Sequence, residues 1–169
     1  LPKINDKLYD GRKPDVLIVG GGISGATIAH ELSKWQLDVM LVEKGYDVAV
    51  GATSRNDGCV HVGIDLTPKL VKHDYLIKGN AMYDELCKDM DVKFERTGHM
   101  MLMYYKWENL LMPIVGLWSK ILKIKGMRYI DRKELLKIEP EAVEWARGAY
   151  YMPTGGMVSP YKLTVALAE

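Results

Sequence analysis

The sequence predicts an α/β fold, in which a strand–helix–strand unit is followed by a segment of mixed helices and short strands. Three observations support this prediction. They are the apolar, β-branched run Val16–Val19, the glycine-rich turn Gly20–Gly25 directly after it, and a second apolar strand, Asp38–Val42, that ends on Glu43. Because Val16–Val19 is too short for a helix and shows no polar alternation, we expect a strand buried on both faces.

The glycine-rich turn GGGISG joins the first strand to a helix. Its G-x-G-x-x-G pattern falls on Gly20, Gly22 and Gly25, and helical spacing follows over Ala26–Ser33. Gly20 permits the tight turn, Gly22 lets a pyrophosphate approach the backbone, and Gly25 lets helix and strand pack closely. The unpaired N–H groups and positive dipole end of such a helix favour a bound phosphate. These features predict a Rossmann-like dinucleotide site.

An acid ends the second strand at a position that suits a nucleotide. Glu43 lies 18 residues after Gly25. A carboxylate there can accept hydrogen bonds from the hydroxyls of an adenosine ribose, and it would repel the 2′-phosphate of NADP. These residues alone do not separate NAD from FAD, so both stay open at this point.

Composition narrows the class of protein. The 169 residues carry a net charge of +1, so composition gives no support for binding to nucleic acid or for bulk electrostatic binding to a membrane. Two cysteines make neither a disulfide framework nor a metal-ligand cluster, so a reducing, cytoplasmic compartment is expected. No apolar run approaches the ~18 residues of a membrane span. The chain does not begin with Met and its last helical segment has no stop signal, so we expect a piece of a longer protein.

A long polar loop follows the second strand. The segment Lys44–Pro68 is rich in glycine and small polar residues, and a loop of this length in a compact domain is usually functional. Within it, Gly51–Gly63 (GATSRNDGCVHVG) allows backbone N–H groups to approach an anionic or planar ligand. Arg55 offers a fork for phosphate or carboxylate, and His61 offers a donor whose protonation can change.

A helix is predicted after the loop, over Lys69–Met90, because apolar residues recur there at steps of three and four. This stripe is expected to face the core rather than to bind a ligand. It consists of Tyr75, Gly79, Met82, Leu86 and Met90.

Shorter elements fill the rest of the chain. We place a domain boundary near Asp91, where helical spacing gives way to extended segments and turns. Asp131, with Glu134 three residues later, predicts an N-capped helix over Arg132–Ile138. Extended segments are expected at Val92–Glu95, His99–Tyr105, Tyr129–Ile130, Gly148–Met152 and Met157–Val158, and a last helix at Tyr161–Glu169.

A helix-like stretch over Trp107–Lys125 leaves two interpretations open. Pro113 and Gly116 are expected to interrupt it. Its part Leu110–Lys125 combines an apolar run with Trp118 and three lysines. Such a segment either docks on a membrane surface and passes electrons to quinone, or packs on the sheet of its own domain, which we favour.

Several motifs together resemble a known family. They are the glycine-rich turn with Glu43, the step Thr53–Arg55, the set Gly58, His61 and Gly63, the segment Phe94–Gly98 (FERTG) and the segment Gly155–Pro160 (GGMVSP). The chain resembles the FAD-dependent oxidoreductases of the D-amino-acid oxidase type, and within them glycerol-3-phosphate and L-2-hydroxyglutarate dehydrogenases. The resemblance covers Asp15–Glu169, which corresponds to the N-terminal part of such an enzyme.

The resemblance implies FAD as the cofactor and a division into parts. Residues 1–14 would form an N-terminal arm, 15–91 the first part of the FAD-binding domain, 92–154 the first part of an α+β substrate (cap) domain on an antiparallel sheet, and 155–169 the return to the FAD-binding domain. It also implies cofactor contacts for Gly20, Gly22, Ile23, Ser24, Gly25, Glu43, Lys44, Thr53, Ser54, Asn56, Gly58 and His61.

His61 and Arg55 are the candidate catalytic residues, and the catalytic base is not identified. His61 is expected beside the flavin, while a structural histidine and a covalent link to the flavin stay open. Arg55 either balances phosphate charge, faces substrate or forms a surface ion pair. Cys59 is expected to be a buried thiol rather than a redox-active one.

No metal site is expected. His30, His73 and His99 show no metal-ligand spacing, and we expect them at the surface or in packing roles. Asn56 and Asp57 also fit the simpler role of capping a turn.

The implied function is oxidation of a small anionic 2-hydroxy compound, with glycerol 3-phosphate as the best candidate, by hydride transfer to FAD. The alternatives are oxidation of L-2-hydroxyglutarate or an amino acid on the same fold, a non-catalytic dinucleotide-binding subunit, and an NAD-binding domain. Electrons would pass to a quinone, a partner subunit or oxygen. No nucleic-acid partner is expected.

Overall fold

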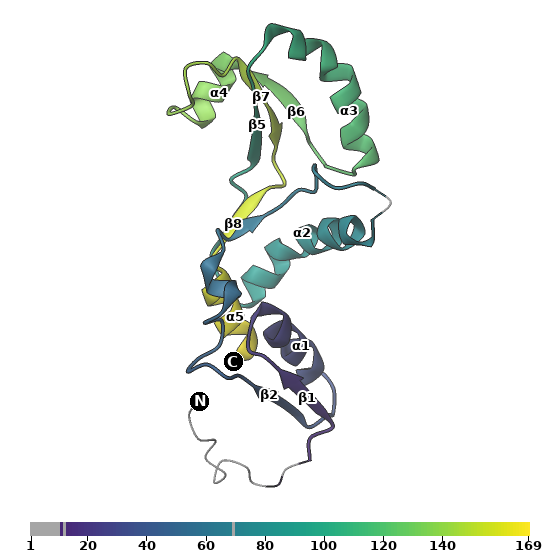
Figure 1. The fold of residues 1–169 in the computed structure, drawn as a ribbon, viewed down its shortest axis with the longest axis vertical. Coiled ribbons are helices and arrows are strands. Elements are labelled where there is room, and N and C mark those ends of the chain that lie inside the picture. Colours follow the sequence, from purple (N-terminus) through teal and green to yellow (C-terminus); the bar gives the residue numbers. More distant parts are fainter. Residues whose placement is uncertain (1–10, 12, 69) are drawn as a thin grey trace. The chain divides into compact units, whose positions relative to one another are not determined.

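The protein, seen here as a computed structural model that describes residues 11, 13–68 and 70–169, forms two compact units (Figure 1). The first unit contains the described residues up to Asn56 together with Pro160–Glu169. The second contains the described residues of Asp57–Ser159. Most of the predicted arm over 1–14 lies outside the described residues. The functional boundary expected near Asp91 falls inside the second unit and stays a prediction.

The first unit has a strand–helix–strand core. Strands β1 (Val16–Val19) and β2 (Val39–Val42) pair in parallel. A parallel pair needs a crossover connection, which α1 (Ile23–Ser33) supplies while packing on both strands. Helix α5 (Pro160–Ala168) packs against α1 and against the short 3-10 helix η2 (Ala52–Arg55). This arrangement confirms the predicted α/β fold.

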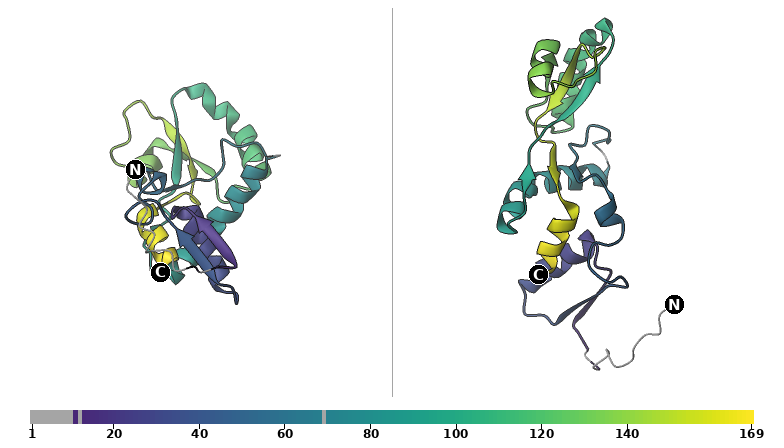
Figure 2. Two further views of the ribbon diagram at one scale, coloured as in Figure 1. Left: turned by 60° about the horizontal axis from the view of Figure 1, so that its bottom comes forward. Right: turned by 90° about the vertical axis from the view of Figure 1, so that its left-hand side faces the viewer.

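Strand β1 is covered on one face only, so the expectation of burial on both faces is wrong. Ile18 is 8% exposed and faces α1, whereas Leu17 is 55% and Val19 81% exposed. Helices α1 and α5 (yellow) form the apolar layer on the Ile18 side, where Ala26 and Leu163 are buried (Figure 2, right). Within the described part of this unit, no element covers the opposite face.

The second unit contains two antiparallel, three-stranded sheets. The first sheet has the order β3 (Cys59–Val60), β8 (Gly156–Val158), β4 (Phe94–Glu95). The second has the order β5 (His99–Met103), β7 (Gly148–Met152), β6 (Arg128–Asp131). Because β7 runs through a short turn into β8, one continuous segment forms the central strand of both sheets.

Helices and two apolar clusters complete the second unit. The helices are α2 (Val71–Asp89), the 3-10 helix η3 (Lys106–Leu111), α3 (Met112–Ile121) and α4 (Arg132–Ile138). One cluster is formed by Val62, Leu122, Ile124 and Met152. The other is formed by Ile130, Leu135, Ala146 and Ala149.

Element bounds agree best where a local signal marks them. The backbone N–H of Glu134 donates to Asp131 Oδ1 at 2.8 Å, so the predicted cap of α4 is confirmed. Helix α1 begins at Ile23, three residues before the predicted start at Ala26, because Ile23–Gly25 already form its first turn after the extended N-cap Gly22. The segment predicted only as loop contains η2 and β3.

The stripe predicted as the buried face of α2 contains no buried residue, so that prediction is wrong. Gly79, Leu86 and Met90 are half-buried, and the other two residues are exposed. Tyr75 is 71% and Met82 60% exposed. The buried positions recur every seven residues and are His73, Asn80 and Cys87. His73 Nε2 lies 3.1 Å from a backbone carbonyl oxygen just after α3, and the Asn80 amide donates to two backbone carbonyls. Polar contacts therefore anchor this helix, and a search for apolar periodicity misses them.

The segment η3–α3 also departs from the prediction. Pro113 lies in the first turn of α3 and begins the helix instead of interrupting it, and the helix continues through Gly116. The favoured packing on the sheet is found only at the end of the predicted segment, where Leu122 and Ile124 are buried with Met152 of β7. The helix itself leaves its apolar side chains exposed, since Leu110 is 78%, Ile114 64% and Leu117 61% exposed. Among the described residues, no helix has the length and apolar character needed to cross a membrane.

Arg96 ties α2 to the first sheet and to the turn after β7. Its guanidinium donates to the Asp84 carboxylate, to Asn80 Oδ1 at 2.9 Å and to the Asn80 carbonyl oxygen at 2.8 Å. It also donates to the carbonyl oxygen of Thr154. The guanidinium lies 4.7 Å from the centre of the Phe94 ring, within the range of a cation–π contact.

Replacement of Arg96 by alanine is expected to lower the free energy of unfolding by about 1–3 kcal/mol, because it removes a charged donor and leaves the part-buried Asn80 Oδ1 without it. Lys93→Ala is the matched control, since its ion pair with Glu95 is exposed at both ends and should contribute nothing measurable. Urea titrations of the two variants measure the difference. Equal destabilisation by both substitutions would contradict this role for Arg96.

The hydrogen bond between Arg96 and Asp84 also predicts how the stability of the fold depends on pH. The hydrogen bond from Arg96 holds the pKa of Asp84 below its ordinary value of 3.8. A carboxylate with a lowered folded pKa stabilises the fold above the unfolded pKa, and that contribution is lost as the pH falls through the folded value. We expect the wild-type protein to lose more stability than Arg96→Ala between neutral pH and the acid range.

Candidate functional site

The glycine-rich turn has the geometry that a pyrophosphate needs. Gly20 has φ +108°, a conformation that side chains rarely tolerate, and an added Cβ there would meet no atom within 4 Å. Its backbone is therefore open to a ligand. A Cβ on Gly25 would overlap the carbonyl oxygen of Gly20, so only glycine lets α1 approach the turn so closely.

Thr53 connects the start of α1 to η2. The backbone N–H of Ile23 donates to Thr53 Oγ1 at 3.1 Å, and a Cβ on Gly22 would lie 3.2 Å from the same hydroxyl oxygen. Thr53 is 9% exposed, whereas Ser24 lies exposed in the first turn of the helix. The predicted cofactor residue Thr53 thus positions the turn, while Ser24 and the helix N-terminus remain accessible to a phosphate.

Glu43 is held by two backbone N–H groups. Its Oε2 accepts from Gly21 at 2.6 Å and its Oε1 accepts from Gly45 at 2.8 Å. These hydrogen bonds lower the pKa of the Glu43 carboxyl, so it is ionised at neutral pH. The first unit has a cavity of about 350 Å³ beside this carboxylate, lined by Val19, Gly20, Val42, Glu43 and Lys44.

These residues fit an adenosine. A carboxylate has about four lone-pair positions, and the two backbone contacts leave capacity for ribose hydroxyls. The exposed ends of Val19 and Val42 give the cavity apolar walls. The open backbone of Gly20 lies at the same cavity, so a diphosphate can follow from the ribose to the helix N-terminus.

The predicted cofactor residues Ser54 and Asn56 form hydrogen bonds with the backbone of their own short segment. The Ser54 hydroxyl donates to Gly51 at 3.5 Å, and the Asn56 amide donates to the Thr53 carbonyl at 2.8 Å. Asn56 therefore caps η2, which was the simpler of its two expected roles. Arg55 is exposed. Cofactor contacts by these side chains stay predictions.

Gly58 and His61 belong to the second unit. Gly58 is buried with φ +70°, and its carbonyl accepts from the Val158 N–H at 3.0 Å. The His61 carbonyl accepts from the Asn80 amide at 2.8 Å, which fixes its backbone, while its ring is exposed. The imidazole is thus exposed, and its predicted place beside the flavin stays a prediction.

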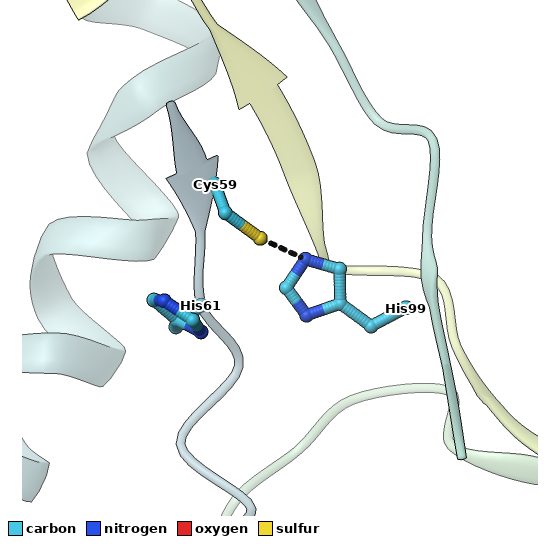
Figure 3. A group of neighbouring side chains, drawn as sticks. All are labelled: Cys59, His61 and His99. Carbon is cyan, nitrogen blue, oxygen red and sulfur yellow. Dashed lines mark hydrogen bonds between the residues drawn. The ribbon is translucent and has the colours of Figure 1, made fainter. Parts of the chain in front are cut away.

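The structure adds a neighbour that spacing did not reveal. His99 Nε2 lies 3.0 Å from Cys59 Sγ, and the rings of His99 and His61 have centroids 5.9 Å apart (Figure 3). Cys59 is half-buried rather than fully buried. The Cys-x-His spacing on an extended segment was a usable signal, because residues two apart share a face. The position of His99, 38 residues after His61, had no such signal.

A parallel strand–helix–strand unit with an open glycine turn and a ribose-binding acid defines a dinucleotide-binding protein. The comparison with known families makes this specific. Residues 15–169 match the DAO family, described as FAD dependent oxidoreductase. The chain belongs to this family of flavoprotein oxidoreductases, whose cofactor is FAD. The NAD-binding interpretation is therefore set aside.

Named relatives share the family. The chain is 36% identical over 158 residues to the glycerol 3-phosphate dehydrogenase of Caloramator mitchellensis, covering 92% of this chain and 32% of the relative. It is 30% identical to the glycerol 3-phosphate oxidase of Mycoplasma pneumoniae, and the match covers 75% of this chain and 34% of that relative. The human mitochondrial L-2-hydroxyglutarate dehydrogenase is 29% identical, and the match covers 92% of this chain and 34% of that relative. The chain spans about a third of the length of these relatives.

Solved structures agree on the fold. The dithionite-reduced L-α-glycerophosphate oxidase of Mycoplasma pneumoniae, with FAD bound, matches with a TM-score of 0.79 at 25% identity, covering 93% of this chain and 42% of that one. The glycine oxidase of Bacillus cereus matches with a TM-score of 0.79 at 24% identity, and the match covers 92% of this chain and 44% of that one. The second match supports the fold alone.

The close approach at Gly25 gives a testable prediction. Gly25→Ala should favour the helix intrinsically by up to about 1 kcal/mol, but its Cβ overlaps the Gly20 carbonyl, and such overpacking costs about 1–3 kcal/mol. We therefore expect lower stability and weaker FAD binding. Gly79→Ala is the control, because Gly79 lies within α2 in the second unit and an added Cβ there would meet no atom within 4 Å. Flavin binding measured by fluorescence quenching should change in the first variant only. Unchanged binding in Gly25→Ala would contradict the fit.

Proposed function

We propose that the chain is the cofactor-binding and early substrate-domain part of a dehydrogenase or oxidase that acts on a small anionic 2-hydroxy compound, glycerol 3-phosphate being the best candidate. The observation that carries the proposal is the ionised Glu43 at the cavity beside the open glycine turn. Two relatives named for glycerol 3-phosphate, at 36% and 30% identity, support the choice of substrate.

The first unit would hold the adenosine diphosphate end of FAD. Glu43 would accept hydrogen bonds from the ribose, and the N–H groups at the start of α1 would donate to the diphosphate. We also propose FAD contacts for the remaining residues of the predicted set. They are Gly20, Gly22, Ile23, Ser24, Gly25, Lys44, Thr53, Ser54, Asn56 and Gly58. FAD supplies, when bound, the isoalloxazine that takes up a hydride from a carbon bearing a hydroxyl.

His61 and Arg55 are the proposed functional side chains of the loop. The exposed imidazole of His61 has ring nitrogens that can donate or accept a hydrogen bond, so it would polarise or deprotonate a substrate hydroxyl beside the flavin. Arg55 would pair with a phosphate or carboxylate through its planar fork. A small anionic substrate needs one group of each kind.

Two alternatives keep a specific observation in their favour. Oxidation of L-2-hydroxyglutarate is supported by relatives named for that activity at 29% and 30% identity. Oxidation of an amino acid is suggested by the shared fold of the Bacillus cereus glycine oxidase, whose 24% sequence identity supports the fold alone. A non-catalytic dinucleotide-binding subunit is the remaining alternative, and loss of substrate oxidation with retained flavin would favour it.

The electron acceptor is proposed to be a quinone, a partner subunit or oxygen. Exposed apolar side chains on η3 and α3 suit peripheral contact with a membrane, where a quinone would be reached. They are Leu110, Ile114, Leu117, Trp118 and Ile121.

The test is anaerobic reduction of the purified full-length protein that contains this chain. The proposal expects a bound flavin whose visible absorption bleaches on addition of glycerol 3-phosphate. Bleaching only by L-2-hydroxyglutarate or by an amino acid would select that alternative and contradict the preferred substrate. A flavin that no such compound reduces would contradict the enzymatic proposal.

Glu43→Gln should weaken FAD binding by roughly tenfold or more, because a charge-assisted acceptor of ribose hydroxyls is lost. The amide would also place N–H groups against a backbone donor at Gly21 or Gly45. Glu31→Gln is the matched control, since Glu31 forms an exposed ion pair with Lys34 on α1. Dialysis against graded FAD measures the affinities. An equal affinity in the two variants would contradict the proposed role.

A further inference from the structure

Three side chains with metal-ligating atoms converge in the second unit. Cys59 and His61 lie two residues apart on the extended segment that includes β3, and His99 begins β5 (Figure 3). Their ligand atoms, Cys59 Sγ and one ring nitrogen of each histidine, all lie within 4.8 Å of one another. The Cys59 Sγ to His99 Nε2 distance is 3.0 Å.

The sheets fix this convergence. Cys59 pairs with Met157 on β8, and His99 pairs with Met152 on β7, so one short turn joins the strands that carry both partners. Gly155 lies in that turn, and a Cβ there would overlap the His99 ring. The backbone N–H of Gly98 also donates to the Gly155 carbonyl at 3.0 Å. The close contact between His99 and Cys59 therefore follows from backbone pairing and a glycine.

The spacing suits a tetrahedral zinc ion. With Zn–S near 2.3 Å and Zn–N near 2.0–2.1 Å, a tetrahedral site places sulfur and nitrogen about 3.6 Å apart and two nitrogens about 3.4 Å apart. The ligand atoms lie within 4.8 Å of one another, so shifts of roughly 1.5 Å or less would complete the geometry. Exposed His61 supplies a path for the ion.

We propose that Cys59, His61 and His99 form a zinc-binding site with a fourth position open to water. Soft sulfur with two imidazoles is a donor set that suits Zn²⁺. The Asp57 carboxylate, which accepts the Cys59 N–H at 3.0 Å, adds negative charge next to the site. On binding, the Cys59 Sγ–H bond breaks, an Sγ–Zn bond forms, and the proton leaves to solvent.

Zinc binding has a consequence that rests on the proposed function. If His61 acts beside the flavin, Zn²⁺ takes the ring nitrogen that would serve the substrate. The ion would then inhibit substrate oxidation, and a chelator would restore the activity.

Direct binding is the test, using the full-length protein in competition with a chromophoric chelator for Zn²⁺. The expected result is one ion per chain. Cys59→Ser and His99→Gln should each lower the affinity by at least roughly tenfold, the smallest loss seen even for outer-shell partners of a metal. The controls are Cys87→Ala and His30→Gln, because these residues lie outside the cluster. Equal affinity in all four variants would mean an adventitious ion only and would overturn the proposal.

Two further measurements avoid dependence on variants that fail to fold. Co²⁺ bound to the wild-type protein should show a thiolate-to-cobalt charge-transfer band, and Zn²⁺ should slow alkylation of Cys59. Absence of the band, or unchanged alkylation, would overturn the site. Both readouts are independent of substrate, so they stand even if the protein oxidises none of the proposed compounds. Inhibition by Zn²⁺ that persists in Cys59→Ser would contradict the functional consequence alone.

Discussion

The close approach of α1 to the turn before it is the constraint on which the first unit depends. Only a glycine at residue 25 lets the helix reach the Gly20 carbonyl, and this brings the helix N-terminus beside the end of β1. The turn then presents its N–H to Glu43, which fixes the acid at a cavity. One steric requirement thus positions the phosphate-binding end and the ribose-binding acid together.

Much of this unit could be predicted because its signals are local. The glycine spacing, the apolar strands and the terminal acid each report on neighbours a few residues away. Burial of β1 could not be predicted in the same way, since it depends on which layers cover the strand. Leu17 and Val19 are apolar in sequence and still exposed in this chain, which spans about a third of its relatives' length.

In the second unit, contacts between residues distant in sequence could not be predicted from the sequence. Asp131 was identified as a cap because its partner lies three residues away. The buried face of α2 was missed because it is held by polar contacts of His73 and Asn80 with distant carbonyls. The sequence predicts a surface or packing role for His99, because it shows no metal-ligand spacing to other residues. Strand pairing, which sequence spacing does not encode, brings it to Cys59.

The central claim is that the glycine turn and Glu43 hold the adenosine diphosphate of FAD. The most direct measurement is a crystal structure of the full-length protein with FAD. The account predicts ribose hydroxyls at hydrogen-bond distance from the Glu43 carboxylate, about 2.5–3.0 Å, and the diphosphate against the N–H groups that begin α1. An adenosine bound elsewhere, with Glu43 contacting only its own backbone, would contradict it.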